Sequence, residues 1–442
     1  MAASVFTSDL YHRLFPVGDI GKLFTDSAEV RAMLLVEGAL AKVQGELGVI
    51  PQDSAAYIHR SCMEVQIDPG NLSKATGQNG VPVPALVAAF RKEMQAPEHA
   101  QYVHWGATSQ DIMDTAQMLR LRQMLNHMET GLRSLLTALA DLSERHAALP
   151  MAGRTYGQHA TPTSFGATVA HWGAPLLDLL AGMEGLRSRV LWVSLSGAAG
   201  TSAALGPQAA TTRASLAQAL GLIDPKRSWH SDRSPILTLC AWLTQLATAL
   251  GKMAEDQLLM TQTDLNELTL ATSGGSSTMP QKQNPVQPAA IAALARQTIG
   301  VNAIVQGAGL HRQDRDGAAW FTEWLSLPQL CLCAAATLET STQLIPCLSP
   351  NPIAMARALA DQHGQIHAEA LSFELARHMP RPDAQAAVKT LCAQAIDTHT
   401  ALKDLAQAQF PEASLDAIFD PEHQIGTAAQ DARAFAARVN AL

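Results

Sequence analysis

Residue types that can do chemistry gather in three short segments of this sequence, the first of which is GGSSTMPQKQNP, residues 274–285. Its paired glycines leave the backbone free, which predicts a loop. The loop carries a hydroxyl at Ser276, a cation at Lys282 and an amide at Asn284. Such a set suits an anionic substrate and a proton-transfer step. The competing interpretation is an ordinary loop whose Ser and Asn side chains satisfy backbone groups.

The second segment, HWGATSQDIMDT at residues 104–115, places polar donors just before a predicted helix. Thr108, Ser109 and Gln110 are clustered there, and Asp111 is able to cap the helix. Donors at a helix N-terminus bind carboxylates and phosphates well. The alternative is a helix cap that has no ligand.

The third segment is GRTYGQHATPTSFG at residues 153–166. It contains Arg154, Tyr156, Gln158 and His159 within a stretch that is otherwise uncharged. A histidine in such surroundings can titrate near neutrality and exchange protons. The alternative is a hydrogen-bonded histidine of the core.

The elements that must position these segments are predicted to be helices. Apolar residues recur at alternating spacings of 3 and 4 from Met118 to Leu142, which predicts one long helix that stops near Pro150. A shorter run over residues 33–47 has the same spacing, with Asp26 and Glu29 as a capping pair before it. No stretch alternates convincingly between apolar and polar residues. The predicted fold class is therefore all-α.

Stretches without formal charge indicate the centre of this fold, because helices that are neutral all round are buried on all sides. They lie between Arg154 and Asp178, Arg189 and Arg213, Arg233 and Lys252, and Glu267 and Lys282. They predict a central bundle that other subunits bury further. The expected domains are an N-terminal helical domain at residues 1–107, a central helix-bundle domain at 108–350 and a C-terminal helical domain at 351–442.

Composition excludes several classes of protein. Only 16% of the 442 residues are charged, which argues against a disordered chain and suggests a large subunit interface. A net charge of −8 without a basic run argues against nucleic acid as a partner. The N-terminus lacks the pattern of a secretory signal, and the uncharged residues 236–250 are too few to span a membrane, so a soluble cytoplasmic protein is expected. His363 and His367 have no third ligand nearby in sequence, so no metal site is expected.

The three segments, in their order and spacing, resemble the three signature regions of the fumarase/aspartase superfamily, and the pattern GSSxMPxKxNP is highly specific. The resemblance implies an all-α fold of three domains around a bundle of long helices. It also implies a homotetramer in which each active site takes the three regions from three different subunits.

Roles for individual residues follow from the same resemblance. In this superfamily a base removes a proton beside a carboxylate, which gives an aci-carboxylate, and a leaving group departs from the neighbouring carbon. The loop serine that transfers the proton falls on Ser276, and Lys282 and Asn284 match the substrate-binding Lys and Asn. A serine acts as a base only when its pKa is lowered, so Lys282 and loop amides must stabilise the alkoxide. The general acid stays open among Ser276, His159 and Tyr156.

The expected substrate is a small di- or tricarboxylate, and the resemblance implies no metal and no organic cofactor. Besides Lys282 and Asn284, the residues expected to bind it are His104, Thr108, Ser109, Gln110, Arg154, Gln158, Arg315 and Trp320.

Within the superfamily the chain resembles most the branch of 3-carboxy-cis,cis-muconate cycloisomerases. This likeness rests on four features. The first is the segment at residues 102–115, and the second is an aromatic residue, Tyr156, where the lyases usually have His. The other two are Trp229-His230 before an Asp-Arg pair and AAWFTEWLSLPQL at residues 318–330. In that reaction a substrate carboxylate adds to a muconate double bond, and the aci-carboxylate is then protonated to give a lactone.

Three glutamines depart from the pattern of this branch. Gln281 and Gln283 stand where basic residues are frequent, and Gln313 stands where His is common. The loss of positive groups leaves open a second function, a C–N lyase that releases fumarate from an N-substituted aspartate.

Overall fold

The computed structural model describes residues 4–271, 274–275 and 277–442. These residues are predominantly helical, which confirms the all-α prediction. They form two compact units, each assembled from three segments of the chain. Unit 1 comprises residues 1–131, 179–248 and 293–339, and unit 2 comprises residues 132–178, 249–292 and 340–442. The three-domain division stays a prediction.

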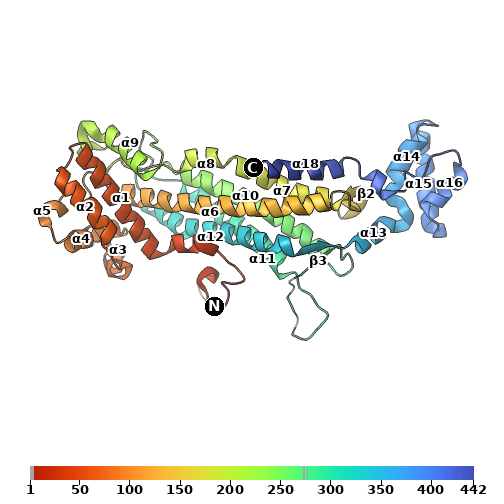
Figure 1. Cartoon of the computed structure of the whole chain (residues 1–442), viewed down its shortest axis with the longest axis horizontal. Coiled ribbons are helices and arrows are strands. Elements are labelled where there is room, and N and C mark those ends of the chain that lie inside the picture. Colours follow the sequence, from red (N-terminus) through yellow and green to blue (C-terminus); the bar gives the residue numbers. More distant parts are fainter. Residues whose placement is uncertain (1–3, 272–273, 276) are drawn as a thin grey trace. The chain divides into compact units, whose positions relative to one another are not determined.

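Unit 1 holds the helices of the N-terminal region and two short helices from the middle of the chain. They are α1 (Asp26–Glu46), α2 (Gln52–Glu64), α3 (Ser73–Asn79), α4 (Val83–Glu93), α5 (Pro97–Ala100), α8 (Met183–Val190) and α9 (Ala209–Leu220). Helices α1 and α2 lie side by side (Figure 1), so close that a Cβ on Gly45 would come within 2.3 Å of Ala55 Cβ. The cap of α1 is Thr25, whose hydroxyl accepts from the Ala28 amide, so the predicted capping residue was wrong by one position.

Long helices contribute residues to both units. They are α6 (Ser109–Arg145), α7 (Phe165–Ala181), α10 (Ser234–Met260), α11 (Val286–Ala308) and α12 (Gly317–Leu344). The predicted seam of α6 is confirmed, since every apolar side chain of that seam from Met118 to Leu142 is buried. The helix ends before Pro150, which begins a strand.

The uncharged stretches are not all helices, which corrects the prediction. Helix α10 and most of α7 fit, but residues 191–202 form irregular backbone that is buried over much of its length. Its polar groups are satisfied by side chains: the Ser194 amide donates to Thr115 Oγ1 and the Ser196 amide to Asp111. Absence of charge therefore indicates burial here, without indicating a helix.

Two helices are long and apolar enough to span a membrane by length and composition alone. They are α10 and α11, in which 56% and 50% of the most apolar window is buried within the chain. Helix α10 is longer than the uncharged stretch predicted because it continues through Lys252, Glu255 and Asp256. Core helices of soluble proteins have the same features.

Unit 2 contains short strands, which the sequence analysis did not predict. Strands β1 (Pro150–Thr155) and β2 (Gln158–Ser164) form an antiparallel hairpin, and β3 (Leu268–Leu270) pairs with β4 (Leu348–Pro350). The hairpin turns at Tyr156 and Gly157, whose φ angles of 53° and 73° are those of a tight primed turn. A tyrosine at the first of these positions gives no recognisable turn signal, so the hairpin was missed.

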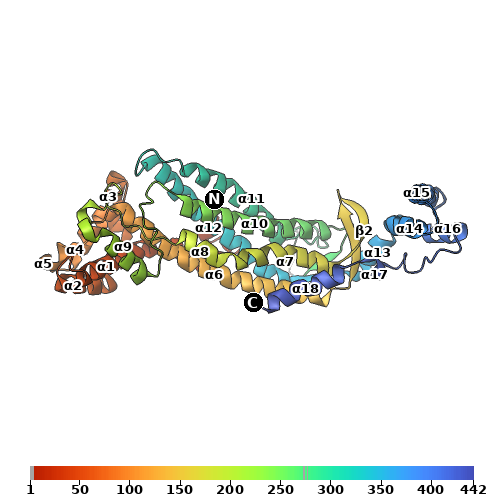
Figure 2. The ribbon, with the colours of Figure 1, turned by 90° about the horizontal axis from the view of Figure 1, so that it is seen from above.

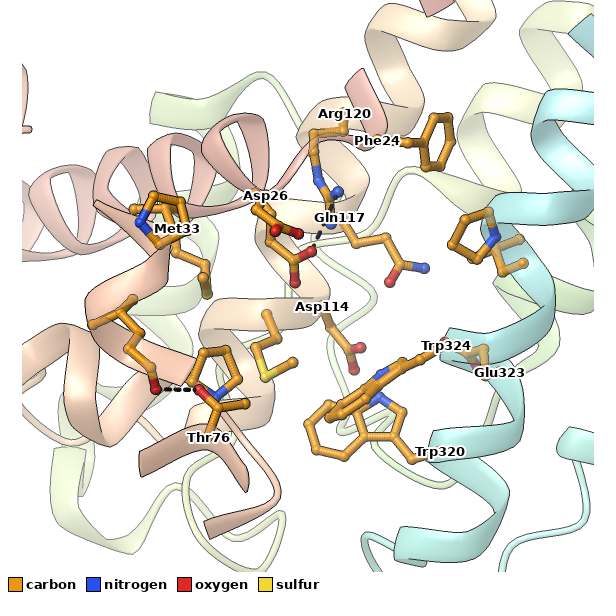
Figure 3. Close-up of a pocket in the computed structure, with 18 of the residues that line it drawn as sticks. Phe24, Asp26, Met33, Thr76, Asp114, Gln117, Arg120, Trp320, Glu323 and Trp324 are labelled. Carbon is orange, nitrogen blue, oxygen red and sulfur yellow. Dashed lines mark hydrogen bonds and ion pairs between the residues drawn. The ribbon is translucent and has the colours of Figure 1, made fainter. Parts of the chain in front are cut away.

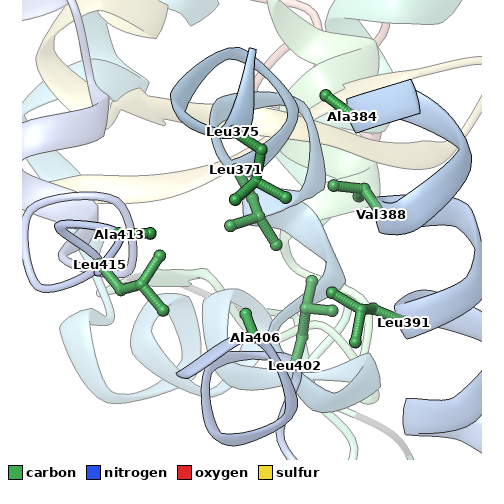
Figure 4. Packing of buried hydrophobic residues seen from close by; sticks show 9 residues of the cluster. All are labelled: Leu371, Leu375, Ala384, Val388, Leu391, Leu402, Ala406, Ala413 and Leu415. Carbon is green, nitrogen blue, oxygen red and sulfur yellow. The ribbon is translucent and has the colours of Figure 1, made fainter. Parts of the chain in front are cut away.

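The C-terminal part of unit 2 has its own apolar cluster. The helices are α13 (Pro352–Ala360), α14 (Ala368–Leu375), α15 (Arg381–Thr398), α16 (Leu402–Gln409), α17 (Pro421–Gln424) and α18 (Ala428–Asn440). Figures 1 and 2 show α14, α15 and α16 gathered together, and Figure 4 shows Leu371, Val388 and Leu402 among the buried residues that join them. Helix α18 packs elsewhere: Phe435 lies where a Cβ on Gly173 of α7 would stand.

Candidate active site

The second segment folds as the start of α6, around a buried and fully bonded carboxylate. Asp111 accepts hydrogen bonds from the Thr108 amide (3.0 Å), Ser194 Oγ (3.1 Å), the Ser196 and Gly197 amides (both 2.9 Å) and His230 Nε2 (2.8 Å). Burial opposes the charged form, but the hydrogen bonds, that of His230 first, outweigh it and lower the pKa of Asp111. Asp111 therefore fixes the positions of Thr108 and Ser109 at the helix start.

Gln110 is buried beside Asp111 and links the helix start to Arg315. Its amide nitrogen donates to Asp114 (3.2 Å) and to the His230 carbonyl (2.9 Å), while its oxygen accepts from Arg315 Nε at 3.4 Å. Arg315 also donates to the Ala198 carbonyl at 2.6 Å. The fold thus brings together two predicted substrate-binding residues 205 positions apart, and Gln110 acts on Arg315 from within the core.

His104 carries a charge partner that the sequence did not reveal. Its Nδ1 lies 2.7 Å from Oε1 of Glu37, a carboxylate whose side chain is 2% exposed. Burial alone would lower the pKa of His104, but the hydrogen bond and charge of Glu37 outweigh it and raise that pKa. Glu37 therefore shifts His104 toward protonation and holds its ring in place.

We expect Glu37→Gln to lower the pKa of His104, measured by NMR titration of the ring. A raised pKa means that the pair stabilises the fold below the unfolded pKa of about 6.5, and that this contribution is lost as pH rises through the folded pKa. The fall in the free energy of unfolding between pH 5 and pH 9 should therefore shrink by about 1 kcal/mol in the variant. Glu98→Gln, next to the more loosely paired His99, is the control. An unchanged His104 titration would contradict the assignment.

The third segment forms the β1–β2 hairpin. Arg154 is anchored there by a two-pronged ion pair, with Nη1 and Nη2 each 2.8 Å from an oxygen of the buried Glu267. Glu267 already neutralises the charge of Arg154 within unit 2, so the contact of Arg154 with substrate stays a prediction. Tyr156 and Gln158 are exposed and His159 is half-buried at the turn. The hairpin thus presents Tyr156 and Gln158 outward, with His159 partly covered beside them.

The first segment forms a loop closed at its base by a short antiparallel bridge. The Gly274 amide donates to the Asn284 carbonyl (2.9 Å), and the Asn284 amide donates back (2.8 Å). A Cβ on Gly274 would lie 2.5 Å from Val286 Cγ2, so a larger residue there would require the Val286 side chain to move. Lys282 is exposed on this loop. Ser276, the predicted proton-transfer residue, lies outside the described residues.

The described residues of unit 2 do not connect the hairpin to this loop directly. Among them, no hydrogen bond or ion pair joins Tyr156, Gln158 or His159 to Lys282 or Asn284. Of the predicted site residues, Gln110 and Arg315 are joined by a side-chain hydrogen bond, and Arg154 and His159 are strand partners in the hairpin.

The sequence analysis did not predict a buried ionic cluster that lies next to Gln110. Arg233 is held by Asp114 (2.8 and 3.1 Å) and by Glu323 (2.9 and 2.7 Å), and its guanidinium lies 4.8 Å from the centre of the Trp229 ring. Burial raises the pKa of Asp114 more than Arg233 lowers it. The sequence signal for this cluster is Arg233, which stands directly before an uncharged helix. A cation buried there requires buried carboxylates as partners.

Trp320 lies on α12. It is buried, packs against Trp324 at 4.7 Å between ring centres, and lines a cavity with residues of α1 and α6. Its predicted contact with substrate stays a prediction.

Comparison with known proteins gives one consistent family. A family model described as lyase matches residues 16–300. A 3-carboxy-cis,cis-muconate cycloisomerase of Pseudomonas aeruginosa is 35% identical over 437 residues, which cover 96% of this chain and 95% of that protein. A nitrosuccinate lyase of Streptomyces davaonensis is 33% identical over 424 residues, 91% of this chain and 89% of its own.

A solved structure supports the same conclusion. The crystal structure of 3-carboxy-cis,cis-muconate lactonizing enzyme from Pseudomonas putida matches with a TM-score of 0.92 and 30% identity, covering 98% of this chain and 99% of that one. The expected likeness in both sequence and fold is therefore confirmed, and the chain belongs to the lyase family within the fumarase/aspartase superfamily of enzymes.

Proposed function

We propose that the chain is a cycloisomerase that converts 3-carboxy-cis,cis-muconate to 4-carboxymuconolactone, in the protocatechuate branch of aromatic degradation. The observation that carries this proposal is that relatives named for this reaction match nearly the full chain, both in sequence and in fold. A C–N lyase that releases fumarate from an N-substituted aspartate is the second candidate. It is favoured by the glutamines at 281 and 283 and by the similarity to a nitrosuccinate lyase.

The chemistry proceeds without a change of oxidation state in the protein. A carboxylate oxygen of the substrate bonds to one carbon of a double bond, and the electron pair moves onto the neighbouring carboxylate to form an aci-carboxylate. A proton then bonds to the carbon beside that group. Thr108, Ser109 and the start of α6 offer donors to a substrate carboxylate, and Arg315 offers a second set. The positive charge of Arg315 favours the extra negative charge of the intermediate, and His104 is placed to add a hydrogen bond to it.

In this proposal Ser276 transfers the proton and Lys282 lowers its pKa, with Asn284 contacting the substrate. Tyr156, Gln158 and His159 extend the site from the hairpin, and either Tyr156 or His159 is the alternative general acid. The hairpin presents Tyr156 and Gln158 outward, which supports a site completed by another subunit.

A homotetramer with shared active sites is part of the proposal. The low charged fraction of 16% supports it. So do apolar side chains left exposed on the long helices, among them Ile299, Ile304 and Leu325 at 47%, 52% and 78%. The three-domain organisation and a soluble, cytoplasmic location complete the proposal, with no nucleic acid and no membrane as partner.

An ultraviolet assay with purified protein tests the function. We expect rapid loss of the diene absorption of 3-carboxy-cis,cis-muconate, unchanged by a metal chelator. No loss at high enzyme concentration would contradict the cycloisomerase. Release of fumarate from a panel of N-substituted aspartates would then identify the lyase instead.

A further inference from the structure

Arg315 is half-buried and forms no ion pair with a carboxylate in the described part of the chain. Its two hydrogen bonds go to uncharged oxygens, those of the Gln110 side chain (3.4 Å) and of the Ala198 backbone (2.6 Å). Arg154 and Arg233, by contrast, are each held by buried carboxylates. The charge of Arg315 is therefore available to an anion from outside the protein.

The two oxygens occupy one edge of the Arg315 guanidinium. Gln110 accepts from Nε and Ala198 accepts from Nη2, two nitrogens that donate in parallel along one side of the group. No described residue accepts from Nη1, so the end formed by Nη1 and Nη2 is left for a ligand. A carboxylate at this end would make the two-pronged contact for which arginine is suited.

The Gln110 oxygen is fixed because the rest of its amide group is buried and bonded. The amide nitrogen donates to the His230 carbonyl (2.9 Å) and to Asp114 (3.2 Å). Figure 3 shows Asp114 on the side of α6 that faces α12, the helix that begins two residues after Arg315. These two bonds set the orientation of the amide and direct its oxygen at Arg315.

The Ala198 carbonyl is fixed through Asp111. The amides of Ser196 and Gly197, the two residues before Ala198, both donate to this carboxylate at 2.9 Å. His230 Nε2 lies 2.8 Å from the same carboxylate, and it is the donor because an ionised carboxylate only accepts. His230 therefore supports both oxygens, one with its own carbonyl and the other with its ring through Asp111.

The segment of His230 also contacts the loop of Arg315 directly, since Ser231 Oγ donates to Asp314 at 3.2 Å. His230 is only 1% exposed and Asp111 is fully buried, so neither side chain can reach a substrate. Any effect of these two residues on binding must therefore pass through a residue such as Arg315.

We propose that Asp111 and His230 are positioning residues for Arg315, which hold one edge of its guanidinium on the protein so that the Nη1–Nη2 end binds a substrate carboxylate. This inference rests on the proposed function, in that the substrate is a small di- or tricarboxylate. Both candidate reactions use such a substrate, so the inference holds for either. Because His230 acts through Arg315, its loss matters only while Arg315 is present.

Binding of tricarballylate, a saturated tricarboxylate without a double bond or a leaving group, tests this without turnover. Calorimetry with the full-length protein measures it. We expect Arg315→Lys, which keeps the charge but loses the two-pronged end, to weaken binding about 10-fold. His230→Leu removes the ring donor and keeps the backbone carbonyl. It should weaken binding about 5-fold in the parent but less than about 2-fold in the Arg315→Lys background. His230→Gln keeps a side-chain N–H donor and should bind within about 2-fold of the parent.

Two further variants complete the test. His367→Leu removes a buried histidine of unit 2 and should change binding less than about 2-fold. Ser194→Ala removes another donor to Asp111 (3.1 Å) with little change in volume, so it replaces His230→Leu if circular dichroism shows that variant to be unfolded. It should weaken binding about 3-fold, again only while Arg315 is present.

Equal losses in the parent and Arg315→Lys backgrounds would overturn the proposal, because they would show a general effect on the fold. Unchanged binding in Arg315→Lys, or no binding of tricarballylate to the parent, would overturn it as well. A parent that binds tricarballylate but converts neither 3-carboxy-cis,cis-muconate nor any N-substituted aspartate would contradict the proposed function alone.

Discussion

Replacement of Ser276 by alanine is expected to lower kcat for lactonisation by at least about 100-fold, with a smaller change in KM. The serine is proposed to move the proton in the step that resolves the aci-carboxylate, an interaction made in the transition state. Substrate carboxylates are held elsewhere, by the start of α6, Arg315 and Lys282, so ground-state binding should persist. Initial rates at varied 3-carboxy-cis,cis-muconate concentration measure both parameters.

The neighbouring Ser277→Ala is the matched control for this variant. Ser277 has the same hydroxyl on the same loop, and its side chain is exposed. We expect its kcat to stay within about 3-fold of the parent enzyme, since no proton transfer is assigned to it. A Ser276→Ala enzyme with full activity would show that His159 or Tyr156 transfers the proton. The same substitutions in those two residues would then decide between them.

Replacement of Arg233 by methionine is expected to reduce the free energy of unfolding by about 3–5 kcal/mol. Arg233 is fully buried, and its removal leaves Asp114 and Glu323 facing each other without a cation. Methionine fills part of the space but neutralises neither carboxylate. Guanidinium denaturation followed by circular dichroism at pH 7 measures the loss.

Two comparisons show whether charge is the cause. Arg312→Met removes an exposed arginine that pairs with Asp316, and it should leave the denaturation midpoint nearly unchanged. Combining Arg233→Met with Asp114→Leu and Glu323→Leu removes both stranded carboxylates and should restore most of the stability. Equal losses in the single and triple variants would mean that packing, and not the unpaired charge, sets the cost.

Local pattern was enough for the long helices and for the family. The seam from Met118 to Leu142 predicted α6 because helical periodicity is a property of neighbouring residues. The pattern over residues 274–285 identified the superfamily for a related reason, since a motif is read along the chain. The uncharged stretch between Arg233 and Lys252 located a buried helix and that between Arg189 and Arg213 located buried backbone over residues 191–196, but the described part of the stretch between Glu267 and Lys282 is largely exposed, so burial there was predicted wrongly. The stretches did not reveal whether buried backbone is helical, because side chains such as Asp111 can satisfy buried amides outside a helix.

The pairing of β1 with β2 and the turn at Tyr156 and Gly157 are set by tertiary contacts and could not be predicted from local sequence. A tyrosine with φ of 53° is unfavourable in isolation, and here it connects strands that pair from Pro150 to Ser164. The sequence offered the residues of the hairpin but no local preference that would have predicted its turn.

By itself the sequence determined the helical class, the family and the chemical types of the candidate site residues. Only the tertiary structure decided which charged side chains already have a partner of opposite charge. Arg154 is held by Glu267, Asp111 by His230, and Arg233 by partners 119 and 90 positions away. The physical reason is that the state of an ionisable group depends on burial and on the charges within a few ångströms of it. Both are set by contacts between distant parts of the chain, which no local pattern encodes.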